Sequence, residues 1–265
     1  MSDSLIETEM SELVIGRSSE HNYRDITPAH HHSRAQFLYA STGIIQVFTP
    51  KHVWLIPPMC ALWIPAYVEH SVRSLSRVKM NTALVEAQAA SVLGQQCFII
   101  RVTKLLHELL IRLNAIEHIP ASELLSSDEL SRALQILIFD EIQKANSLPI
   151  QIPWPQDKRL MSICQALLQA PEHHKALNTW ADEIGTSSRT LMRMFQKETG
   201  LSYRAWLQQV HIAQALSKIA SGESIAQISE SLGYTNPSAF SAMFKRHLGQ
   251  TPQQFKYKDA YNNAE

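Results

Sequence analysis

Three consecutive histidines near the start of the chain, His30, His31 and His32, are the first residues whose chemistry suggests a site. Neutral imidazole nitrogens bind zinc and other late first-row metal ions. Alternate residues of a strand share one face, so on a strand His30 and His32 converge while His31 points away from them. The pattern predicts either a metal site or polar groups that line a pocket, and we expect His31 at the surface.

Two arginines in the C-terminal part, Arg189 and Arg193, stand four residues apart. On a helix that spacing places both side chains on one face. Arginine is the usual bidentate reader of guanine in the major groove of DNA. Taken alone, each arginine is equally consistent with a solvated surface charge, so the interpretation depends on the elements that hold the pair.

The formal net charge of the 265 residues is zero, which by itself argues against binding to nucleic acid. Counting by segment changes this. Residues 1–156 carry 12 Lys and Arg against 15 Asp and Glu, whereas residues 157–258 carry 12 against 7. Asp259 and Glu265 in the tail restore the balance. The sequence therefore predicts an acidic N-terminal part and a basic C-terminal part.

Composition and length predict a folded protein of two domains. A hydrophobic fraction of 45% excludes a wholly disordered, collagenous or coiled-coil chain. The three cysteines, Cys60, Cys97 and Cys164, form no C-x-x-C pair, which disfavours a zinc ribbon or a disulfide framework. The chain starts without a signal-peptide pattern, and no apolar run approaches about 18 residues. We expect a cytoplasmic protein with no membrane partner.

The sequence pattern of the N-terminal part changes once, from β-rich runs to helical periodicity. Residues 1–90 contain short β-rich runs separated by turn residues, the rhythm of a small β-barrel or sandwich. Residues 91–146 have helical periodicity, with a second helix opening at the capping box Ser126-x-x-Glu129. These helices either cover the β core or form a dimerisation surface, and a homodimer is expected. Three prolines then make residues 147–156 an extended linker.

The C-terminal segment, residues 157–258, contains a repeat. Five positions recur 49 residues later with similar residues: Leu191, Phe195, Gly200, Ser202 and Trp206 reappear as Phe240, Phe244, Gly249, Thr251 and Phe255. Each copy reads as a short helix, a turn with glycine, and a second helix. Two helix-turn-helix units are therefore predicted, at about 177–199 and 225–248.

Capping residues support these limits. We expect Ser187 to cap a helix that ends at Gly200, and Asn236 with Pro237 to open its counterpart. A helix of roughly 18 residues between the units is about 27 Å long, so the second helices could enter successive major-groove segments. The side chains opposite the apolar positions are the predicted DNA contacts: Ser188, Arg189, Met192, Arg193, Gln196, Ser238, Ser241, Ala242 and Lys245.

Residues 157–258 resemble the DNA-binding domain of the AraC/XylS family of bacterial transcription regulators. The resemblance rests on G-Y-x-N-x-S-A-F-S-x-x-F-K-R-x-x-G-x-T-P, from Gly233 to Pro252. It implies an all-α domain with two helix-turn-helix units that bind promoter DNA, with RNA polymerase as a possible partner. Ala242 stands where many members carry arginine, so we expect the first recognition helix to supply most of the base discrimination.

The histidine cluster resembles the two cupin motifs, in which two histidines, a glutamate and a later histidine bind a metal inside a small β-barrel. The matching residues are His30, His32, Gln36 and Gly43, followed by Pro65, Tyr67 and His70. Gln36 replaces the carboxylate, which weakens the case for iron chemistry. The resemblance implies an effector pocket lined by His30, His32, Gln36, Trp54, Trp63, Tyr67 and His70, with His30, His32 and His70 as possible ligands of a divalent metal.

The fold class predicted is thus a two-domain α+β protein: a cupin-like β-barrel with a helical extension, then an all-α double helix-turn-helix domain. The function predicted is a sequence-specific transcription regulator, not an enzyme, that responds to a small-molecule effector and requires no cofactor. The alternatives are a metal-dependent cupin enzyme fused to a helical module and a non-specific architectural DNA-binding protein.

Overall fold

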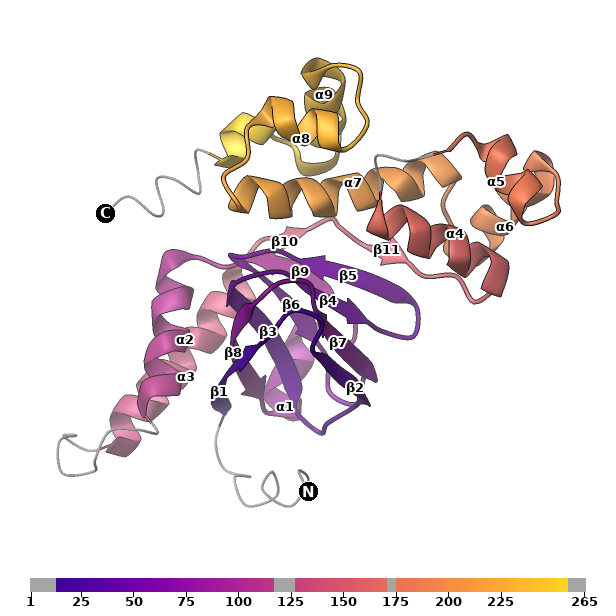
Figure 1. Cartoon of the computed structure of the whole chain (residues 1–265). Coiled ribbons are helices and arrows are strands. Elements are labelled where there is room, and N and C mark those ends of the chain that lie inside the picture. Colours follow the sequence, from indigo (N-terminus) through magenta and orange to yellow (C-terminus); the bar gives the residue numbers. More distant parts are fainter. Residues whose placement is uncertain (1–12, 117–126, 171–174, 257–265) are drawn as a thin grey trace. The chain divides into compact units, whose positions relative to one another are not determined.

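The computed structural model describes residues 13–116, 127–170 and 175–256. Within these limits the chain forms two compact units (Figure 1). The first comprises Met1–Ile45, Pro58–Glu69 and Arg73–Leu148, and the second comprises Gln46–Pro57, His70–Val72 and Pro149–Glu265. The domain boundaries predicted from the sequence stay predictions.

A six-stranded antiparallel sheet is the framework of the first unit. Its strands, in spatial order, are β1 (Val14–His21), β8 (Val78–Val85), β3 (Ala35–Thr42), β6 (Cys60–Ile64), β9 (Phe98–Arg101) and β10 (Ser147–Leu148). Strands β3, β6 and β8 coincide with β-rich runs of the sequence, whereas β9 and β10 lie beyond residue 90.

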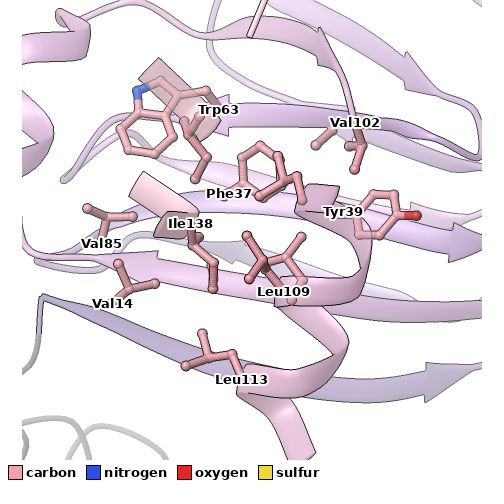
Figure 2. Close-up of a cluster of buried hydrophobic side chains, with 14 of the residues drawn as sticks. Val14, Phe37, Tyr39, Trp63, Val85, Val102, Leu109, Leu113 and Ile138 are labelled. Carbon is pink, nitrogen blue, oxygen red and sulfur yellow. The ribbon is translucent and has the colours of Figure 1, made fainter. Parts of the chain in front are cut away.

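Helices pack on one face of this sheet and close the core of the unit. After the short α1 (Ala87–Ala90) and the 3-10 turn η2 (Ser91–Leu93), α2 (Lys104–Ile116) and α3 (Ser127–Lys144) lie side by side (Figure 1). Figure 2 shows Phe37 and Trp63 of the sheet against Leu109 and Ile138 of these helices, all fully or nearly fully buried. The capping box predicted at Ser126 lies outside the described residues.

Gly16 of β1 permits the close approach of α2. A Cβ at this position would lie 2.6 Å from Oδ1 of Asn114 and 3.0 Å from Cγ of Leu113. Both distances are shorter than ordinary van der Waals contact, so a larger residue here would force α2 away from the strand.

A second sheet of five strands has the order β11-β5-β4-β7-β2. Its strands are β11 (Ile152–Pro153), β5 (His52–Ile56), β4 (Ile45–Phe48), β7 (His70–Ser74) and β2 (Ile26–His30). The proline-rich segment 147–156 therefore supplies two short strands, because β10 pairs with β9 and β11 pairs with β5.

The C-terminal part is helical, from α4 (Lys158–Gln169) to a last turn over residues 252–256. The helices between are α5 (Leu177–Glu183), α6 (Ser188–Thr199), α7 (Tyr203–Ala220), α8 (Ile225–Ser231) and α9 (Pro237–Leu248). The predicted fold class is confirmed at this level: a β-rich N-terminal part precedes an all-α part with two helix-turn-helix units. Among the described residues, no helix is long and apolar enough to cross a membrane.

Candidate nucleic-acid interface

Helix α6 is the second helix of the first helix-turn-helix unit. Ser187 caps it through a 3.2 Å bond from the Thr190 N–H, and Gly200 ends it in the left-handed conformation. Leu191 and Phe195 are fully buried, which fixes the direction of the opposite face. That face holds the residues predicted from the sequence: Arg189, Met192, Arg193 and Gln196 are exposed, and Ser188 is half-buried. The structure therefore brings the two arginines to one accessible helix face.

Helix α9 is the corresponding helix of the second unit. Asn236 caps it, with Pro237 in the first turn, and Phe240 and Phe244 are fully buried. Of the predicted contacts, Ser238, Ala242 and Lys245 are exposed and Ser241 is half-buried. Arg246, which sequence reasoning left out, is also exposed. The adjacent pair Lys245–Arg246 in the last turn was the available signal, since two neighbouring cations on a recognition helix both suit phosphate contact.

Helix α7 connects the two helix-turn-helix units and is buried along much of its length. Its N-cap Ser202 bonds to the Ala205 N–H, and Trp206 and Val210 are fully buried. With 18 residues it is about 27 Å long. Both recognition helices pack against this rod, α6 through Phe195 and Trp206, whose ring centroids are 6.1 Å apart. The rod length is compatible with the roughly 34 Å that separates successive major-groove segments.

Comparison with known proteins supports the helix-turn-helix assignment independently of the structure. Residues 180–258 match the family model described as a helix-turn-helix domain. This match covers both helix-turn-helix units. The chain is a DNA-binding transcription regulator.

Several curated proteins are similar to this regulator. The HTH-type transcriptional regulator NimR of Escherichia coli (strain K12) is 29% identical over 229 residues, which cover 86% of the chain and 82% of NimR. The activator RhaR of the same strain is 28% identical over 64% of the chain and 54% of RhaR. RipA of Corynebacterium glutamicum is 32% identical over 39% of the chain and 31% of RipA. The chain thus spans most of NimR but only about half of RhaR and a third of RipA.

Two kinds of solved structure are also similar. ToxT from Vibrio cholerae aligns over 93% of the chain and 98% of its own chain, with 15% identity and a TM-score of 0.38. The DNA-binding domain of AdpA, solved in complex with a target DNA, aligns over 38% of the chain and 91% of its own, with 25% identity and a TM-score of 0.36.

Three of the regulator's histidines form a group: His30 ends β2, His70 begins the neighbouring strand β7, and His32 lies just beyond β2. One ring nitrogen from each of His30, His32 and His70 lies within 4.8 Å of the others. Nδ1 of His30 lies 2.8 Å from the Pro28 carbonyl oxygen, and Nδ1 of His32 lies 2.6 Å from that of Arg34. A carbonyl only accepts, so both Nδ1 atoms donate, and Nε2 is the ring atom of each that remains to bind a ligand. His31 is exposed, as expected.

The other residues of the predicted effector pocket are dispersed. Gln36 is close to the group, with its side-chain amide 3.1 Å from Nε2 of His32. Trp63 pairs with Phe37 and belongs to the helix-facing core, so it lies on the opposite side of the six-stranded sheet from Gln36. Tyr67 is 69% exposed and contributes its N–H to the His32 carbonyl. Trp54 is buried, and its indole N–H bonds to Thr49 Oγ1. The structure thus unites the histidines and Gln36, but not Trp63.

Proposed function

We propose that α6 and α9 enter successive major-groove segments of promoter DNA, with α6 supplying most of the base discrimination. The observation that carries this is the pair of matching capped helices with exposed outer faces. Arg189 and Arg193 of α6 can each bond a guanine edge, and the exposed Met192 side chain can contact a thymine methyl. On α9, hydroxyls and Lys245 suit phosphate contact, so this helix fixes the register.

Base-resolved footprinting of Arg193→Ala and Lys245→Ala tests this arrangement. The two variants should lose protection at positions about one helical turn, roughly 10 base pairs, apart. Arg77→Ala, which removes an exposed cation that pairs with Glu20 in the first unit, is the matched control and should leave the footprint unchanged. Loss at the same positions for both DNA-facing variants would contradict two separate groove contacts.

The N-terminal part serves as the sensor for a small-molecule effector, and the histidine group anchors it. A regulator of this kind acts in the cytoplasm without catalysis, and RNA polymerase is its further partner at a promoter. Effector binding changes regulation only if it favours one arrangement of the protein over another.

The histidine donor set also fits a divalent metal. The Nδ1 protons of His30 and His32 are held by carbonyls, the second contact typical of histidine ligands, so Nε2 is the atom that would bind the metal. A bound metal would offer a Lewis-acidic position to an effector's oxygen or nitrogen atom. A metal at Nε2 of His32 would replace the contact of this atom with Oε1 of Gln36, which lies 3.1 Å away.

Titration with Co²⁺ distinguishes metal ligation from hydrogen bonding. Wild type should bind about one equivalent with a tetrahedral visible spectrum, and His70→Asn should abolish it, whereas His31→Asn, at the exposed neighbour, should not. If wild type binds no metal, the histidines act as polar anchors. Effector-dependent change in DNA binding should then be lost in His70→Asn without any metal.

The regulator forms a homodimer through the outer face of α3. Ile136 and Leu137 are 54% and 47% exposed, although the opposite face of the helix packs on the core. In an antiparallel pair centred on Ile136, Arg132 faces Asp140 of the partner subunit. Glu129 likewise faces Gln143 and the adjacent Lys144. A parallel pair would oppose like charges, so these residues favour a second copy in the antiparallel arrangement.

Sedimentation equilibrium tests the dimer. Ile136→Glu should shift the protein to monomer, while Val92→Glu, at another exposed apolar residue, should not. Arg132→Asp should weaken the dimer, and adding Asp140→Arg should restore it. Equal behaviour of Ile136→Glu and Val92→Glu would exclude α3 as the interface.

A further inference from the structure

Each helix-turn-helix unit is tied to α7 by one tyrosine hydroxyl. In the first unit, Oη of Tyr203 accepts a 3.1 Å bond from the Trp180 indole N–H of α5 and donates to the Lys175 carbonyl. In the second unit, Oη of Tyr234 lies 3.1 Å from Nδ1 of His211, which is buried in the middle of α7. The two sets of hydrogen bonds therefore join different parts of α7 to different helix-turn-helix units.

Both tyrosines also contact the recognition helix of their unit. The ring of Tyr203 packs edge-on against Phe195 of α6, with centroids 5.3 Å apart. The ring of Tyr234 packs edge-on against Phe240 of α9, with centroids 5.6 Å apart. Each tyrosine therefore connects α7 to the buried face of one recognition helix, and the opposite face of that helix carries the DNA contacts.

The tie in the second unit lies in the turn before α9. Tyr234 closes this turn through its N–H, which bonds to the Ser229 carbonyl at 3.0 Å, and Asn236 caps α9 two residues later. Burial raises the pKa of Tyr234 to about 12, so its hydroxyl stays protonated at neutral pH and can bond to the imidazole. A hydrogen bond fixes direction as well as distance, which apolar packing alone does not.

We propose that Tyr234 with His211, and Tyr203 with Trp180, are separate positioning pairs that each set the angle of one recognition helix on α7. The inference rests on the proposed function, in which α6 and α9 contact different half-sites. Neither pair reaches the exposed side chains that are proposed to face DNA. We therefore assign each pair a role in how strongly its own half-site contributes to binding.

Binding of the full-length protein to three DNAs tests the inference. The DNAs are an operator selected from a random pool by the protein itself and two versions with one or the other half-site scrambled. Tyr234→Phe should bind the intact operator roughly 3- to 30-fold more weakly, as expected for loss of one buried hydrogen bond. This loss should disappear when the half-site of α9 is scrambled. Tyr203→Phe is the matched variant and should show the opposite pattern.

The outcomes separate the two levels of the proposal. If wild type binds all three DNAs equally, the two-half-site function is wrong. If wild type discriminates but both variants weaken binding equally on every DNA, the positioning pairs are wrong. His211→Asn provides a second removal of the Tyr234 pair and should reproduce the Tyr234→Phe pattern. Urea unfolding of each variant confirms that the compared proteins are folded.

Discussion

At the scale of single residues, the side chains proposed to contact DNA lie on the exposed face of α6. Arg189 and Arg193 are exposed because Leu191 and Phe195 occupy the buried face of α6. Their spacing and the caps of the helix were readable from the sequence, so the helix and its exposed face could be predicted. Arg246 was not predicted, because helical phase alone places it beside the chosen face rather than on it.

Arg193→Lys separates base reading from charge. Lysine keeps the positive charge but lacks the planar fork that pairs with a guanine edge. We expect affinity for the operator to fall by about 1–3 kcal/mol at one base position, with an unchanged slope of affinity against salt. Competition binding with single-base operator variants measures both. A loss of affinity that is the same for every base variant, or no loss at all, would show that Arg193 contacts a phosphate instead.

Tyr234 makes stability depend on alkaline pH. Its pKa is raised by burial to about 12 against an ordinary value of 10, although the charges of Arg204 and Arg246 oppose the shift. Between these pH values the unfolded chain has lost a proton that the folded protein keeps, so the free energy of unfolding falls as pH rises. Tyr234→Phe should make this fall shallower by up to about 1.4 kcal/mol per pH unit. Urea unfolding from pH 9.5 to 11.5 measures it, with Tyr23→Phe, at an exposed tyrosine, as control.

At the scale of elements, local chemistry determined the helices better than the strands. The caps at Ser187 and Asn236 bond as the sequence predicted. Strands β1 and β2 went unnoticed because much of each is exposed and carries polar residues, so the apolar run that marks a strand is missing. Leu105 of α2 and Leu137 of α3 are apolar residues of the segment with helical periodicity, yet they are 53% and 47% exposed. Helical periodicity does not say which apolar residues pack against another element, because that depends on the tertiary structure.

The pocket prediction failed at Trp63 for a related reason. The sequence alone does not give the register between β3 and β6, which pairs Trp63 with Phe37 and places it toward the helices. Strand alternation then separates it from Gln36. His30 and His32 were easier to pair, because they are two residues apart, although the predicted strand context fails for His32, which lies beyond the end of β2.

Docking of α2 on β1 depends on Gly16. Gly16→Ala places a Cβ 2.6 Å from Oδ1 of Asn114, so we expect the free energy of unfolding to fall by about 1–3 kcal/mol. Removing the obstructing side chain in Gly16→Ala/Asn114→Ala should recover part of the loss relative to Asn114→Ala alone. Guanidinium unfolding of the four proteins measures this coupling. Simple additivity of the two substitutions would show that the close contact is not the cause.

At the scale of the whole molecule, the zero net charge combines an acidic N-terminal part with a basic C-terminal one.

The segment before α4 contacts α6 and α7 directly. The Trp206 indole N–H bonds to the Pro153 carbonyl at 2.7 Å, and Glu198 of α6 accepts the N–H groups of Gln156 and Asp157. The charge change near residue 157 could be read from the sequence, but these contacts could not.

Two fragments test whether residues 149–156 belong with the DNA-binding part. Fragment 149–265 keeps the bonds to Trp206 and Glu198, whereas fragment 157–265 loses the bonds from Pro153 and Gln156. We expect the longer fragment to be more stable toward urea by about 1–3 kcal/mol, the cost of leaving the indole N–H of the buried Trp206 unpaired. Equal unfolding midpoints would assign these residues no structural role in that part.

The central claim is that this chain reads a specific DNA sequence through two recognition helices. The direct measurement is the affinity of the full-length protein for its selected operator and for scrambled DNA of the same length, at about 150 mM salt. A sequence-specific regulator should prefer the operator by roughly 10³-fold or more. Near-equal affinity for the two DNAs would contradict the account and indicate a non-specific DNA-binding protein.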